Sequence, residues 1–253
     1  NAAVAAALDA GVNLFDTVEM YGKGASEEVL GKALGKRRDE VYVASKYWVD
    51  KLTPLDIRAA CEATLRRLDT DYLDLYQVHW APPAALADEA AETLLALRDE
   101  GKIRYIGLSN FGPQDIARWF NKGEAISNQV GYNLLFRAIE YDVVPACHER
   151  GLGILAYMPL MQGLLAGRYE TPDEVPVSRR RTRHFSGERE GTRHGEAGAE
   201  ELTFSTLRAL RSIAEQTGLD MASMALAWVI AQPWVTSAIV GARKPEQLKR
   251  NLA

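Results

Sequence analysis

Short apolar runs alternate with longer amphipathic stretches along most of the chain. The runs have the length of β-strands, and the stretches between them repeat apolar residues at roughly helical spacing. We predict strands at residues 12–17, 41–46, 73–79, 103–108, 126–132, 153–157 and 235–240. Helices are predicted at 2–10, 26–35, 54–68, 88–100, 113–122, 140–150, 202–217, 221–231 and from Pro245 onward.

Capping residues set several of these boundaries. Gly11 and Gly35 follow helical patterns and are typical residues just after a helix end. Ser26, with two glutamates behind it, is predicted to begin the second helix. Thr53 followed by Pro54 predicts the start of the third helix, because proline is favoured in a first helical turn.

Repeated strand–helix units with short connections predict an all-parallel sheet covered by helices. A doubly wound open sheet and a (β/α)8 TIM barrel both fit this α/β pattern. No Gly-x-Gly-x-x-Gly follows a strand, so the usual sign of a dinucleotide-binding open sheet is missing. Every strand ends in a polar or special residue, and a barrel would bring these ends to one mouth. They are Asp16, Lys46, His79, Ser109, Gln129, Tyr157 and Gly241.

We therefore predict a TIM barrel that forms a single domain over residues 1–253. The sequence begins at Asn1 rather than at Met, inside a helical run, so we expect the first barrel strand to lie ahead of it. Residues 168–201 have few apolar positions and include the run Arg179-Arg180-Arg181-Thr182-Arg183. We interpret them as a long flexible insertion, either a solvated segment or a lid near a ligand.

Composition narrows the class of protein. Hydrophobic residues make up 47% of the 253 residues and charged residues 25%, as in a globular protein with a large core. The net charge of −4 gives no reason to expect nucleic-acid or anionic-membrane partners. Neither an apolar run long enough to span a membrane nor a signal peptide is visible. Cys61 and Cys147 are interpreted as core thiols of a reducing compartment, which indicates a cytoplasmic protein.

Four proton-carrying residues stand near three strand ends: Asp16, Tyr21, Lys46 and His79. Each alone is more often structural, but a barrel forces them together. An ammonium group favours the phenolate of a nearby tyrosine and would lower its pKa, while a buried carboxylate would hold the ammonium. The set can donate a proton to a carbonyl oxygen, with the imidazole orienting the substrate. It contains no metal-ligand spacing and no nucleophile–base pair, so reduction would need a hydride source such as a nicotinamide cofactor.

These residues match the catalytic tetrad of a known family, and the chain resembles the aldo-keto reductases over residues 8–253. The resemblance implies that Tyr21 is the general acid, Lys46 and Asp16 lower its pKa, and His79 orients the carbonyl. The motifs that carry it, in order, are Phe15-Asp16-Thr17 with Tyr21-Gly22, Lys46, His79-Trp80, Gly107-Leu108-Ser109-Asn110-Phe111, Gln129, Tyr157-Met158-Pro159-Leu160 and Gly241-Ala242-Arg243 with Gln247 and Asn251.

The resemblance also implies a cofactor site along the barrel mouth. Ser109, Asn110 and Gln129 would hold the nicotinamide carboxamide, and Tyr157 would stack on the ring. The pyrophosphate would run past Pro159, Leu160 and Gly163, and the adenosine end would contact Gly241, Ala242, Arg243, Gln247 and Asn251. Arg243 with Lys244 would supply the charge for a 2′-phosphate, so we expect NADP(H) rather than NAD(H).

The sequence also departs from the family pattern, and it leaves some questions open. The family's N-terminal hairpin and first strand do not appear in this sequence, and Met158 stands where serine is common. Tyr47, Trp48 and Trp80 are predicted to form an aromatic wall that suits a flat or apolar carbonyl compound, whose identity the sequence leaves open together with the oligomeric state. The alternatives are a nucleotide-binding sensor with little turnover, as in the related potassium-channel β subunits, and a barrel completed by another chain.

Overall fold

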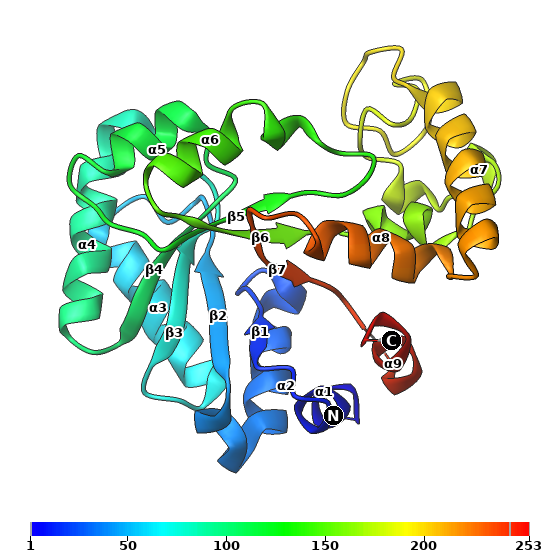
Figure 1. The fold of residues 1–253 in the computed structure, drawn as a ribbon. Helices are drawn as coiled ribbons and strands as arrows, with labels where there is room; N and C mark the ends of the chain where they lie inside the picture. The colour runs from blue at the N-terminus through cyan, green and yellow to red at the C-terminus, as the bar shows by residue number, and fades with distance from the viewer. Residues whose placement is uncertain (1, 243, 253) are drawn as a thin grey trace.

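The computed structural model describes residues 2–242 and 244–252. Its centre is one sheet of parallel strands that follow each other in chain order, each hydrogen-bonded to the next (Figure 1). The parallel α/β architecture predicted from the sequence is confirmed. The strands are β1 (Leu14–Asp16), β2 (Tyr42–Tyr47), β3 (Leu73–Val78), β4 (Ile103–Ser109), β5 (Ser127–Gly131), β6 (Gly153–Tyr157) and β7 (Val235–Ile239).

Helices alternate with the strands and pack around the curved sheet, as in a barrel (Figure 1). The α-helices are α1 (Ala2–Asp9), α2 (Ala25–Leu34), α3 (Pro54–Leu68), α4 (Ala87–Asp99), α5 (Pro113–Trp119), α6 (Val143–Glu149), α7 (Glu200–Thr217), α8 (Met221–Ile230) and α9 (Pro245–Leu252). Short 3-10 helices occupy several connections: η1 (Tyr21–Gly24), η2 (Gly35–Glu40), η3 (Ala84–Leu86), η4 (Ala138–Glu140), η5 (Met161–Ala166), η6 (Pro172–Glu174) and η7 (Val177–Arg179).

The predicted start of α3 is correct and that of α2 is not. Thr53 caps α3 in both directions, since its hydroxyl accepts from the backbone N–H of Asp56 and its own N–H donates to the Asp56 carboxylate. Helix α2 begins one residue before Ser26, after Gly24 in a left-handed conformation. The Ser26 hydroxyl is instead hydrogen-bonded to the Thr17 hydroxyl, 2.9 Å away. It therefore ties the helix to the end of β1.

The sheet has an apolar outer face and a stratified interior. The main core lies between the strands and helices α3 to α6, and every residue of β3 is buried. A smaller apolar cluster of Ala44, Leu75 and Leu155 faces the inside of the curved sheet. Polar residues lie above this cluster, toward the carboxyl ends of the strands. An apolar layer inside the sheet therefore lies beneath the polar residues that are expected to take part in catalysis.

Strands β1 and β7 are the edges of the sheet, and no pairing joins them within the described ranges. A cavity of about 290 Å³ lies between these edges and is bordered by α1. The seven strands predicted from the sequence are therefore all present, in a near-barrel arrangement.

The 168–201 segment folds around a second, smaller core next to α7 and α8 (Figure 1). Val175 and Phe185 are almost fully buried there, and Phe185 packs edge-on against Phe204 of α7. Arg189 pairs with both Asp173 and Glu200, which ties the segment to itself and to the first turn of α7. The segment lies beside the carboxyl ends of the strands, close enough to contribute side chains to the main cavity.

No helix in the described part of the chain combines the length and the apolar character needed to cross a lipid bilayer.

Candidate active site

A cavity of about 770 Å³ opens at the carboxyl ends of the strands. Most of the predicted site residues line it, although they are spread along the chain from Asp16 to Gln247. Those brought together are Asp16, Tyr21, Lys46, His79, Trp80, Ser109, Asn110, Gln129, Tyr157, Pro159, Leu160, Gly163, Gly241 and Gln247.

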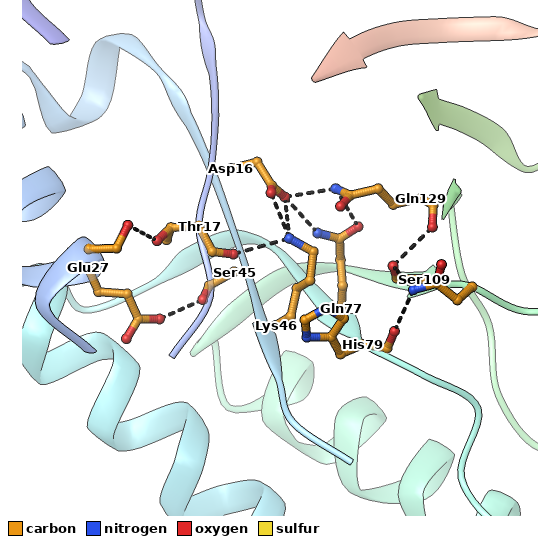
Figure 2. Close-up of polar contacts among 11 residues, drawn as sticks. Asp16, Thr17, Glu27, Ser45, Lys46, Gln77, His79, Ser109 and Gln129 are labelled. Atoms are coloured by element: carbon orange, nitrogen blue, oxygen red, sulfur yellow. Dashed lines mark hydrogen bonds and ion pairs between the residues drawn. The ribbon is translucent and has the colours of Figure 1, made fainter. Parts of the chain in front are cut away.

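Lys46 and Asp16 form a buried ion pair at the bottom of this cavity (Figure 2). The Lys46 Nζ donates to both Asp16 oxygens, at 2.8 and 2.6 Å, and to the Thr17 carbonyl oxygen at 3.2 Å. The side chains are 2% and 7% exposed. A buried pair is stable only when further hydrogen bonds satisfy its remaining atoms, and here two carboxamides do so. The Asp16 Oδ1 atom accepts from Gln129 at 2.8 Å and from Gln77 at 3.2 Å.

Tyr21 is not acidified in this arrangement, contrary to the expectation that Lys46 lowers its pKa. Partial burial and then the negative charge of Asp16 raise the Tyr21 pKa above its usual value. The physical reason is that the ammonium donates its hydrogen bonds to Asp16 and Thr17, so its charge is largely balanced by the carboxylate. The acid strength of Tyr21 therefore depends on how Asp16 and Lys46 are held.

A tight turn presents Tyr21 at the cavity mouth, where the side chain is 53% exposed. Gly22, Lys23 and Gly24 after it all have positive φ, at 60°, 55° and 95°, which explains the two glycines. The same loop is tied to β2, because the Glu19 carboxylate accepts from the Trp48 backbone N–H at 2.9 Å. These contacts hold the Tyr21 loop against the strand that carries Lys46.

His79 is neutral at pH 7. Burial, and then the charge of Lys46, lowers its pKa to about 4. Its Nδ1 atom is buried without a hydrogen-bond partner, and its ring packs edge-on against Trp48 at 4.8 Å. A neutral imidazole with an unpaired nitrogen can donate or accept one hydrogen bond inside the cavity.

Four polar residues form a connected set beside His79. Tyr157 donates to Asn110 at 2.8 Å, and Asn110 donates to the His79 carbonyl oxygen at 3.0 Å and to the Ser109 hydroxyl oxygen at 3.1 Å. Ser109 in turn donates to the Gln129 carbonyl oxygen at 2.9 Å (Figure 2). Asn110 adopts a left-handed conformation, with φ 59°, that asparagine tolerates better than most residues. The set gives one wall of the cavity fixed amide groups.

Three arginines line the far end of the cavity, and the sequence analysis did not assign them a role: Arg168, Arg179 and Arg181. Arg179 donates to the Gln162 carbonyl oxygen and to the Tyr169 hydroxyl. Two of them belong to the run 179–183, which the sequence pattern alone fits to either a solvated segment or a lid. Their position shows that the insertion contributes to the cavity. Other lining residues that the sequence analysis did not single out are Gln162, Ala166, Ser178, Ile239 and Val240.

Two of the residues predicted to contact the adenosine end do not line this cavity. Ala242 lines the smaller cavity between β1 and β7, and Asn251 is not among the residues that line the large one. Arg243 lies outside the described residues.

The predicted aromatic wall is only partly correct. Trp80 lines the cavity and Trp48 packs on His79, but Tyr47 is 3% exposed and lies in the main core against Tyr76. Neighbouring residues on a strand point to opposite faces, so Tyr47 must face the helices when Lys46 faces the interior. Tyr47 therefore does not belong to the pocket.

Within the described residues, no cluster of three or more histidine, cysteine, aspartate or glutamate side chains is arranged to hold a metal ion.

Comparison with known proteins agrees with this geometry. The model of the aldo/keto reductase family matches residues 1–253. Aldo-keto reductase YhdN of Bacillus subtilis (strain 168) is 34% identical over 97% of this chain and 75% of its own length. The NADH-specific methylglyoxal reductase of Escherichia coli (strain K12) is 32% identical over 96% of this chain and 78% of its own.

Solved structures give the same result. The glycerol dehydrogenase AKR11B4 from Gluconobacter oxydans superposes with a TM-score of 0.84 at 31% identity, covering 99% of this chain and 78% of that one. An aldo-keto reductase from Klebsiella pneumoniae in complex with NADPH has a TM-score of 0.78 at 33% identity, covering 99% and 77%. These relatives are oxidoreductases, which favours an enzyme over a sensor subunit. The chain belongs to the aldo/keto reductase family and has its barrel-type fold.

Proposed function

We propose that this oxidoreductase reduces an aldehyde or ketone to an alcohol with NADPH, with Tyr21 as the proton donor. The single observation that carries the proposal is the meeting of Tyr21, the Lys46–Asp16 pair and His79 at one end of a cavity. The amide groups of Asn110 and Gln129 line the same cavity.

The residues present fit a nicotinamide dinucleotide. The cavity of about 770 Å³ has amides and an aromatic ring near Lys46, and arginines at its far end. A carboxamide matches the amides of Asn110 and Gln129, and phosphates match guanidinium groups. Gly163 lines the same cavity with φ 104°, a left-handed conformation that favours glycine. The cavity thus offers complementary chemistry along its length.

Within that site each side chain has a separate task. When bound, the reduced nicotinamide supplies the hydride that reaches the carbonyl carbon. Tyr21 gives its phenolic proton to the carbonyl oxygen as negative charge develops there, which completes the alcohol. Neutral His79 hydrogen-bonds the same oxygen and fixes its direction. Lys46 neutralises part of the Asp16 charge and so limits how strongly that charge opposes ionisation of Tyr21.

The preference for NADPH rests on charge at the far end of the cavity. Arg168 and Arg181 have no ion-pair partner within the described ranges, and both line the cavity with Arg179. Free guanidinium groups suit the extra phosphate of NADPH. The Klebsiella pneumoniae relative bound to NADPH supports this choice, whereas the name of the Escherichia coli relative specifies NADH. Titration with each cofactor decides the matter, and equal or tighter binding of NADH refutes the proposal.

The substrate is proposed to be a small carbonyl compound with an apolar or flat part next to Trp80. Trp80 is 47% exposed and lines the cavity, and Trp48 packs edge-on against the His79 ring. One relative is named a methylglyoxal reductase, so methylglyoxal belongs in a test panel with aromatic aldehydes and simple ketones. The ratio of kcat/KM values across the panel would show which class the site prefers.

We also propose that residues 1–253 act as one domain whose 168–201 segment closes over the cofactor, in a reducing, cytoplasmic environment that keeps Cys61 and Cys147 as thiols. Four residues of the segment line the cavity, Arg168, Ser178, Arg179 and Arg181, which supports a lid rather than a solvated loop. Limited proteolysis should cut the segment more slowly in the presence of NADPH. Equal cleavage rates with and without NADPH would contradict the lid.

Replacement of Tyr21 tests the reaction itself. Tyr21→Phe removes only the hydroxyl, so reduction should fall by a factor of about 10² or more, the range of general acid catalysis. NADPH affinity should stay within about twofold, because no cofactor contact is lost. The readout is consumption of NADPH with the aldehyde panel, alongside a binding titration. Wild-type protein that binds NADPH without consuming it would favour the sensor, and an active Tyr21→Phe would reject Tyr21 as the acid.

A further inference from the structure

Gln77 is a polar residue near the carboxyl end of β3, a strand whose residues are all buried. Its side chain is fully buried in β3. The Nε2 atom donates to the Asp16 carboxylate at 3.2 Å, and the Oε1 atom accepts from Gln129 at 3.5 Å (Figure 2). A buried carboxamide is costly unless its atoms find partners. Both ends of this one are directed at residues of the proposed active site.

The sheet register explains how Gln77 reaches this position. Lys46 lies opposite Gln77, Gln77 opposite Gly107, and Gly107 opposite Ser127, so the four form one row across the sheet. A side chain at Gly107 would place its Cβ 2.8 Å from the Gln77 Cγ, closer than real contacts allow. Gly107 therefore leaves the space that the Gln77 side chain occupies, and two separate positions of the sequence support one contact.

The contact acts on the Asp16 carboxylate. Asp16 accepts from Lys46, Gln77 and Gln129, and only Gln77 has no other proposed task. Gln129 is proposed to serve the nicotinamide carboxamide, so its hydrogen bond to Asp16 is in competition with that role. The negative charge of Asp16 opposes ionisation of Tyr21. An N–H donor that neutralises part of this charge therefore makes Tyr21 a stronger acid.

We propose that Gln77 is a positioning residue that fixes the Asp16 carboxylate against Lys46 and so sets the strength of Tyr21 as a proton donor. The inference rests on the proposed function, in which Tyr21 is the acid. Gln77 does not touch the cavity itself, because it is absent from the residues that line it. Any effect of Gln77 on proton donation by Tyr21 must therefore act through Asp16.

Gln77→Met tests this proposal, since methionine keeps the unbranched shape and removes both polar atoms. One hydrogen bond to a charged group is worth about a tenfold change, so kcat should fall about tenfold. NADPH affinity should stay within about twofold. The alkaline limb of the kcat profile should move to higher pH, because the less neutralised Asp16 makes Tyr21 harder to ionise. A residue that only packs the barrel would lower stability without moving this limb.

Two further variants keep the test decisive. Ser127→Ala is the matched control, because it removes a hydroxyl from the same row that has no hydrogen-bond partner, and it should leave kcat and the alkaline limb unchanged. Gly107→Ala displaces Gln77 without changing its chemistry and should reproduce the kinetic defect. Combined with Gln77→Met it should add little, since both remove the same contact. If Gln77→Met does not fold, the comparison of Gly107→Ala with Ser127→Ala carries the test.

The outcomes separate this inference from the function on which it rests. If Tyr21→Phe is inactive while Gln77→Met keeps kcat within twofold and the same alkaline limb, the role of Gln77 is refuted and the reductase stands. A loss of stability and cofactor affinity without a pH shift also refutes it, because that result describes a packing role. If Tyr21→Phe stays active, Tyr21 is not the acid, and the proposed role of Gln77 is refuted together with it.

Discussion

Breaking the buried Lys46–Asp16 pair should cost stability as well as activity. Lys46→Met keeps the length of the side chain but leaves the Asp16 carboxylate, 7% exposed, without its counter-ion. Removing one partner of a buried pair costs about 3–5 kcal/mol. Gln77 and Gln129 still donate to Asp16, at 3.2 and 2.8 Å, so the loss should fall at the lower end, about 3 kcal/mol. Carbonyl reduction should fall with it, because an Asp16 carboxylate without its counter-ion makes Tyr21 a weaker acid.

Urea unfolding followed by circular dichroism measures this loss as a change in midpoint at constant slope. Adding Asp16→Asn to Lys46→Met removes the orphaned charge, so the double variant should recover about half or more of the lost free energy. Arg183→Met is the matched control: it breaks a surface pair with Glu196, both largely exposed, and should cost less than about 1 kcal/mol. A Lys46→Met variant as stable as that control, or a double variant that is less stable still, would refute the reasoning.

Three shorter predictions address other parts of the site. The His79 pKa is about 4 in the folded protein, below its value near 6.5 in the unfolded chain, so the unfolded state binds more protons between these pH values. The free energy of unfolding should therefore fall by at most about 3 kcal/mol as the pH drops from about 6.5 to 4. His79→Gln should flatten this part of the pH profile, measured by urea midpoints. Tyr47→Phe removes a buried hydroxyl without a partner and should raise or leave unchanged the thermal midpoint, with KM unaltered, whereas Trp80→Ala should raise KM. Arg181→Gln should weaken NADPH binding about tenfold in a fluorescence titration, and Arg183→Gln, outside the cavity lining, should not.

The parts of the fold that could be predicted are those that local pattern determines. Lys46 and His79 line one cavity, as the βα repeat predicts, because the repeat forces parallel strands to end on one side of the sheet. Tyr47 could have been assigned to the core from the same rule, since side chains alternate along a strand. The predicted strand ends at Lys46, but β2 continues to Tyr47, so the alternation of faces applies to that residue too.

Other features depend on contacts that no local pattern contains. The 168–201 segment shows no apolar periodicity. Its buried residues Val175 and Phe185 stand ten positions apart and belong to a core that they share with distant residues, including those of α7. Its arginines divide between structure and cavity: Arg189 pairs with two carboxylates, whereas Arg181 lines the cavity. Charge alone could not distinguish these two roles.

The acid strength of Tyr21 shows where residue-by-residue reasoning stops. An ammonium and a carboxylate on neighbouring strands, with a phenol in the following connection, allow two outcomes, depending on whether the cation faces the phenol or the carboxylate. The structure gives the second, because the Lys46 Nζ lies within 2.8 Å of both Asp16 oxygens. The field at Tyr21 is then set by how completely Asp16 is neutralised, and that balance includes Gln77 and Gln129, which come from two further strands. A change in either amide should therefore alter the chemistry of a tyrosine to which neither is hydrogen-bonded.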